Sequence, residues 1–159
     1  MRRAIGLLLV LTGCSDGTGT TTDTVAAPAS EEVAFAVSVV SGGLSVVDSE
    51  STRPLVGQWQ VVINELAGVG GRVNFVNSTL RDAESGAVAW PTGYLSLNAE
   101  GIAAQAGTNR LAAKGTLRVS QSLQFALLSG GRRAVVTVAV QFLDERGRLL
   151  TQTAEGRVE

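Results

Sequence analysis

The stretch Arg133-Ala-Val-Val-Thr-Val-Ala-Val-Gln-Phe-Leu143 alternates with a period of two, and it decides the fold class. One face of this stretch carries Ala134, Val136, Val138, Val140 and Phe142. Successive side chains of a β-strand point to opposite faces, so the pattern predicts a strand with one buried face. Residues 115–127 alternate in the same way, with Leu117, Val119, Leu123, Phe125 and Leu127 on one face.

Other segments with this alternation, rich in valine, leucine and threonine, are residues 33–40, 44–47, 58–66, 72–80 and 148–158. The segment 44–47 follows a glycine pair and is either a continuation of the first strand or its partner. Trp59, Val61 and Ile63 share one face of the segment 58–66, and Val73 shares a face with Phe75 in the segment 72–80.

The connections between these segments favour turns. The sequences at 82–86 and 144–147 both end in glycine, which suits the left-handed position that closes a short hairpin loop. The nearest approach to a helical period is at 99–113, where Gly101 and Gly107 weaken it. We therefore expect no helix and about seven strands.

Roughly evenly spaced strands over residues 33–159 predict an all-β, antiparallel β-sandwich. The pattern resembles the immunoglobulin-like domains of bacterial surface proteins, although the chain lacks the paired cysteines of antibody domains. The expected domain is thus an immunoglobulin-like β-sandwich that occupies residues 33–159.

The N-terminus begins with Met1-Arg2-Arg3, and an apolar run at 4–11 and small residues follow. This order is typical of a secretory signal peptide, and the run is too short to span a bilayer as a helix. The segment Leu11-Thr12-Gly13-Cys14 is similar to the lipobox of bacterial lipoproteins. An ordinary signal peptide with an incidental cysteine is the alternative.

The lipobox resemblance implies cleavage between Gly13 and Cys14, which removes residues 1–13 as a signal peptide. It further implies that the Cys14 thiol receives diacylglycerol and that the new amine is acylated, so that membrane lipid is the first expected partner. Ser15 stands where an aspartate would resemble an inner-membrane retention signal, so the outer membrane is favoured if the source is Gram-negative. The expected localisation is the bacterial cell envelope.

Residues 14–32 form the expected lipidated cysteine and a flexible tether. Threonine, glycine and alanine dominate this segment, and such compositions cannot offset the entropy of ordering.

Composition excludes several function classes. Histidine is absent and cysteine occurs once among the 159 residues, so Ser-His-Asp triads, histidine metal sites and disulfide frameworks cannot form. The net charge of −1 gives no electrostatic footprint for nucleic acid. We expect no catalytic residues, no cofactor and no metal.

Several charged and glycine-rich segments have an ordinary structural interpretation. The loop 68–71 precedes a strand and lacks a P-loop lysine, so it is interpreted as a bulge or hairpin. The acidic pairs are assigned to solvated turns and strand ends: Asp48/Glu50, Asp82/Glu84 and Asp144/Glu145. Glu65 shares its parity with apolar neighbours, so it lies at a strand end or needs a partner such as Arg72 or Arg118.

Two surface features are candidates for binding. Trp90 and Tyr94 lie in a turn-rich segment, where exposed aromatic rings often serve recognition, and they are the candidate ligand contacts, with a glycan among the ligands. Partial insertion into the core is the commoner alternative for such rings. Trp59, by contrast, is expected in the core. Arg132-Arg133 and the arginines at 146 and 148 would form an anion-attracting rim if their loops shared an end, but solvated loop ends are the simpler expectation.

The function expected from the sequence is a membrane-anchored envelope lipoprotein with a non-catalytic binding or structural module, with an envelope protein or a glycan as partner. Two alternatives stay open. One is an accessory or assembly subunit that adds a partner's strand to a sheet edge. The other is a protease inhibitor that presents one loop.

Overall fold

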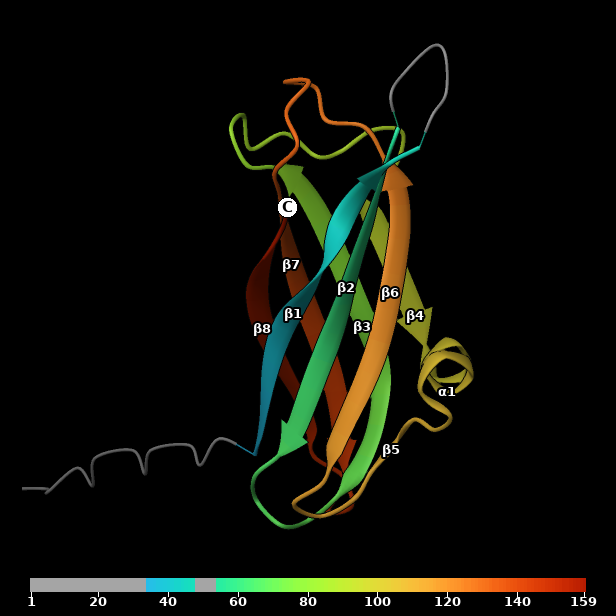
Figure 1. The fold of residues 1–159 in the computed structure, drawn as a ribbon. Helices are drawn as coiled ribbons and strands as arrows, with labels where there is room; N and C mark the ends of the chain where they lie inside the picture. The colour runs from blue at the N-terminus through green and yellow to red at the C-terminus, as the bar shows by residue number, and fades with distance from the viewer. Residues whose placement is uncertain (1–33, 48–53) are drawn as a thin grey trace, which may run out of the picture. The chain divides into compact units, whose positions relative to one another are not determined.

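Figure 1 shows the computed structural model, which describes residues 34–47 and 54–159. The expected signal peptide, Cys14, the tether and the pair Asp48/Glu50 lie outside the described residues. The elements in chain order are β1 (Phe35–Val46), β2 (Leu55–Glu65), β3 (Gly71–Asp82), β4 (Tyr94–Asn98), α1 (Ala99–Ala106), β5 (Arg110–Leu111), β6 (Thr116–Phe125), β7 (Ala134–Asp144) and β8 (Leu149–Val158).

Two antiparallel sheets face each other, so the predicted all-β sandwich is confirmed. The three-stranded sheet has the order β1-β2-β6, and the five-stranded sheet has the order β4-β3-β7-β8 with β5 paired to β3. Constant-type immunoglobulin sandwiches place strands A, B, E and D in one sheet and C, F and G in the other. Here β1, β2 and β6 match A, B and E, and β3, β7 and β8 match C, F and G, whereas β4 pairs with β3 in the five-stranded sheet. The described part of the chain has eight strands, one more than the expected seven or so.

The core lies between the sheets and follows the predicted parity. Residues of β7 alternate between buried and half-buried along the whole strand, with Phe142, Val140, Val138 and Val136 on the inner face. Trp59 is 2% exposed, which confirms its predicted place in the core. The rings of Phe35 and Phe142 pack between the two sheets with their centroids 5.2 Å apart.

One predicted face is wrong. A β-bulge at Asn74 shifts the register between β3 and β7, so that Val73 pairs with Phe142 and Phe75 with Gln141. The extra residue reverses the parity of the strand. Val73 therefore points into the core, whereas Phe75 lies on the outer face of the five-stranded sheet and is 43% exposed.

The segment 94–111 also departs from expectation, because it forms β4, the short helix α1 and β5. The helix is defined by its ends. The Asn98 side chain accepts a hydrogen bond from Gly101 N at 2.9 Å, and Gly107 adopts the left-handed conformation of a C-cap, with φ +78°. In the described residues, no helix has the length and hydropathy of a transmembrane segment.

The glycine pair at 42–43 does not end the first strand. It forms a bulge, and Leu44 to Val46 continue β1 in register with β2. The loop 68–71 is also not a hairpin, because β2 and β3 belong to different sheets and the loop crosses between them. The predicted hairpin at 144–147 is present between β7 and β8, with Gly147 at φ +82°.

Candidate functional site

The two aromatic residues that the sequence nominates are both exposed and have different backbone partners. Tyr94 begins β4, pairs with Thr79 of β3 and is 60% exposed on the outer face of the five-stranded sheet. Trp90 is 57% exposed, but its backbone exchanges two hydrogen bonds with Ala126, just beyond β6 in the other sheet. The backbone of Trp90 is therefore joined to the segment that follows β6, whereas Tyr94 belongs to the five-stranded sheet.

A second exposed aromatic residue lies on the same outer face as Tyr94, and the sequence did not reveal it. Phe75 lies on the same outer face, because the bulge at Asn74 turns it outward. Tyr94 stands opposite Thr79, four residues along β3 from Phe75, so the two rings are roughly 14 Å apart at strand spacing. The aromatic residues of the core are different, since Trp59, Phe35, Phe125 and Phe142 are 2% exposed or less.

The outer face of the sheet between these rings carries mostly uncharged side chains. We call it the aromatic face; its members are Phe75, Asn77, Thr79, Tyr94, Ser96, Thr137, Ala139, Gln141, Thr151 and Thr153. Ser96 Oγ donates a hydrogen bond to Asn77 Oδ1 at 2.6 Å. Glu155 at the β8 end of the row accepts a hydrogen bond from Thr137 Oγ1 at 3.2 Å, and Arg72, Arg81 and Arg157 stand at the ends of the strands.

Glu65 ends β2 and is buried, and its partners are backbone amides instead of the proposed arginines. Its carboxylate accepts hydrogen bonds from Gly68 N at 2.9 Å, Val69 N at 3.2 Å and Lys114 N at 2.7 Å. Burial alone would raise the pKa of Glu65, but these N–H groups outweigh it and hold the pKa below its usual value. Glu65 thus joins the β2–β3 loop to the turn before β6.

Asp82 and Asp144 are also buried, which corrects their assignment to solvated turns. Hydrogen bonds from Ser129 are the largest cause that lowers the pKa of Asp82, and they outweigh burial. Burial would raise the pKa of Asp144, but Arg148 N and Arg148 Nε, both at 2.7 Å, hold it below its usual value. Each carboxylate is a structural anchor for a loop.

The arginine pairs do not form a shared rim. Arg133 pairs with Glu84 at 3.2 Å before β7 begins, whereas Arg148 pairs with Asp144 after β7 ends. An 11-residue strand separates these positions, which is about 35 Å at the rise of a β-strand.

A buried polar network crosses the core. Gln121 Oε1 accepts hydrogen bonds from Trp59 Nε1 at 2.7 Å and from Ser78 Oγ at 2.6 Å. These donors come from β2 and β3, so Gln121 links both sheets. Gln121 Nε2 is buried and has no partner among the described residues.

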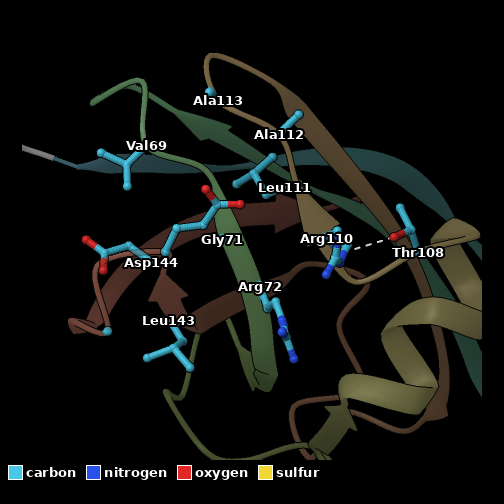
Figure 2. A pocket seen from close by; sticks show the side chains of 12 residues that line it. Val69, Gly71, Arg72, Thr108, Arg110, Leu111, Ala112, Ala113, Leu143 and Asp144 are labelled. Atoms are coloured by element: carbon cyan, nitrogen blue, oxygen red, sulfur yellow. Dashed lines mark hydrogen bonds between the residues drawn. The ribbon is translucent and has the colours of Figure 1, made fainter.

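A cavity of about 720 Å³ lies where the β2–β3 loop, the start of β3, the β5–β6 connection and the end of β7 meet. Figure 2 shows Arg72 of β3 and Arg110 of β5 side by side in its lining. These residues are directly opposite each other in the β3–β5 pair. This arrangement could not be predicted from the sequence, because a two-residue strand has no detectable period.

No family model matches this chain, and no curated protein matches it. Two solved structures have a similar fold. The Northeast Structural Genomics Consortium target SoR45 has a TM-score of 0.63 and 10% identity over 79% of this chain and 86% of the other. The putative ApaA protein from Bordetella pertussis has a TM-score of 0.57 and 17% identity over 78% of this chain and 91% of the other. At these identities the likeness shows the fold alone.

Proposed function

We propose that this chain is a lipid-anchored protein of the bacterial cell envelope and that its β-sandwich is a non-catalytic recognition module. The lipobox-like segment that ends at Cys14 supports the anchor, through membrane lipid attached at that residue. In this proposal the aromatic face is the binding surface, and a neutral glycan is its ligand. The outer membrane is favoured if the source is Gram-negative.

The exposure of Phe75 and Tyr94 on the same face of one sheet is the observation that carries this proposal. Large aromatic rings gain about 1.5–3 kcal/mol when they are fully buried, so two rings left on one face favour a surface that a ligand covers. The hydroxyl and amide groups between the rings suit a ligand that offers apolar ring faces and hydroxyl groups together. Sugars combine these two properties.

The environment of the buried carboxylates supports a binding role more than a catalytic role. Among the described residues, three carboxylates are buried, those of Glu65, Asp82 and Asp144, and each accepts hydrogen bonds from loop backbone groups. A general acid or base needs a proton-transferring group that faces a ligand cavity, and lowered pKa values suit structural anchors better than acids.

The experiment is a panel of neutral polysaccharides screened for binding to the full-length lipoprotein in detergent. Tyr94→Ala and Phe75→Ala should each weaken a ligand found there by roughly tenfold, the effect of an interface hot spot. Thr153→Ala, on β8 of the same face, is the matched control and should change binding by less than about twofold. Equal binding by all variants would refute the aromatic face as the binding surface.

The assembly-subunit alternative has one supporting observation, because β8 is an edge strand that pairs over its ten residues with β7. An unpaired edge can accept a partner strand. In-cell crosslinking followed by mass spectrometry would then recover one defined partner in equal amount, and a proline in β8 would abolish that recovery. A protease inhibitor would instead slow at least one member of a protease panel at low stoichiometry.

A further inference from the structure

We infer that the cavity lined by Arg72 and Arg110 is a binding site for a phosphate oxyanion. This site is distinct from the aromatic face and does not depend on glycan binding. We call it the arginine cavity, and Figure 2 shows it from close by.

The positions of the two arginines come from strand pairing. Arg72 of β3 and Arg110 of β5 form a directly opposed antiparallel pair, so their Cβ atoms are about 5 Å apart and their side chains share a face. Like charges directly opposite each other destabilise a sheet pair. Within residues 34–47 and 54–159, neither guanidinium makes an ion pair. The described structure therefore places two positive charges side by side, and a bound anion would reduce their repulsion.

The surroundings are concave and large enough for an anionic group. The lining includes Thr108, whose Oγ1 accepts a hydrogen bond from Arg110 N at 3.0 Å and holds the short strand in place. Apolar groups of Leu111 and Leu143 also contribute. The cavity of about 720 Å³ is open to solvent and is lined by polar and apolar groups together. Charge-assisted hydrogen bonds from guanidinium groups to an anion are stronger than hydrogen bonds between neutral groups.

Two guanidinium groups suit phosphate better than a carboxylate. One arginine fork satisfies both oxygens of a carboxylate, whereas a tetrahedral phosphate offers oxygens to two forks. Two acidic residues also line the cavity. Asp144 is paired with Arg148 at 2.7 Å, and exposed Glu145 makes no ion pair within the described ranges. The negative charge of Glu145 would repel a bound anion, so removing that charge should strengthen anion binding.

The source of the phosphate is a membrane phospholipid or a free phosphate ester. The first described residues lie near the arginine cavity, since Ala34 O accepts a hydrogen bond from Leu66 N and the following loop supplies Val69 to the lining. If the lipid anchor of the proposed function holds, its connecting segment joins the domain at this end. The phospholipid source rests on that anchor, whereas the site itself does not.

The test uses the lipidated full-length protein in dodecyl maltoside, with inorganic phosphate as the probe at constant ionic strength. Amide resonances of Arg72, Thr108 and Arg110 should shift in a saturable way. Arg72→Gln and Arg110→Gln should each weaken the affinity by roughly tenfold, and Glu145→Gln should strengthen it by about twofold to fivefold.

Arg118→Gln, on the three-stranded sheet, is the matched control and should leave the affinity within about twofold of the parent. Tyr94→Ala should also have no effect, so failure of the aromatic face and failure of the arginine cavity are distinguishable. Absence of saturable shifts, or equal affinity in the parent and in both arginine variants, would overturn the proposal.

A second arm identifies the source. The lipidated protein is placed in nanodiscs of phosphatidylglycerol and, separately, in nanodiscs of a phosphate-free galactolipid. If only the phosphatidylglycerol discs shift the resonances that inorganic phosphate shifts, the phosphate is that of a lipid headgroup. If neither disc does while inorganic phosphate does, the ligand is a free phosphate ester, and the site stands.

Discussion

Replacing Glu65 by glutamine should destabilise the domain by about 2–4 kcal/mol at neutral pH. The two carboxylate oxygens accept three backbone hydrogen bonds, from Gly68, Val69 and Lys114. Glutamine has one acceptor oxygen, so two of the three hydrogen bonds would have a neutral acceptor in place of a charged one. The third backbone N–H would face the NH₂ group of the amide and have no acceptor. Hydrogen bonds to charged groups contribute about 1.5–3 kcal/mol and neutral ones about 0.5–1.5 kcal/mol, which sets the expected loss.

The pH dependence gives this prediction its signature. The pKa of folded Glu65 lies below its usual value of 4.5, so its stabilising effect is complete above that value and is lost as the pH falls through the folded pKa. A protonated carboxyl resembles glutamine. The difference in unfolding free energy between parent and variant should therefore shrink below about pH 4.5.

The assay is urea unfolding of the full chain, followed by the fluorescence of buried Trp59 at several pH values. The matched control is Glu145→Gln on an exposed turn, which should stay within about 0.5 kcal/mol of the parent. A Glu65→Gln variant as stable as the parent at pH 7, or a difference that does not change in acid, would refute the structural role of this carboxylate.

Three further predictions concern the core, the tight packing of β3 and the anchor. Gln121→Leu should destabilise the domain by about 2–5 kcal/mol in urea unfolding, because it leaves the Trp59 and Ser78 donors buried without an acceptor. Gly71→Ala should cost at least about 2 kcal/mol by the same assay, since a Cβ there would lie 2.3 Å from Leu143 O, whereas Gly101→Ala in α1 should be neutral or stabilising by up to about 1 kcal/mol. Equal effects of the two alanines would contradict the packing described for β3. Cys14→Ser should abolish labelling of the protein by radioactive fatty acid in cells, and unchanged labelling would contradict the lipid anchor.

The alternation of apolar residues was sufficient to predict the sandwich, because both sheets bury one face. β7 shows that period without interruption, and β6 shows it everywhere except at the buried Gln121. It failed at Phe75, since a single bulged residue at Asn74 reverses the parity and leaves no mark in the composition. It also failed for α1, whose eight residues are defined by the flanking Asn98 and Gly107 more than by an apolar stripe.

The residues of the candidate sites were likewise predicted only in part from the sequence. Tyr94 could be nominated as an exposed aromatic residue from its turn-rich surroundings, and it is exposed. The outward position of Phe75 and the pairing of Arg72 with Arg110 depend on register, which arises only when distant strands meet. Glu65 could be recognised as unusual from its parity, but its partners are backbone amides, which no side-chain pattern encodes.

The most direct test of the proposed recognition role is a map of amide chemical shifts on addition of the tightest-binding neutral glycan. If the aromatic face binds the glycan, the largest chemical-shift changes should occur at Phe75, Asn77, Tyr94 and Ser96, on β3 and β4 of the five-stranded sheet. Shifts confined to the outer face of the three-stranded sheet, around Gln58 and Ser120, would contradict it.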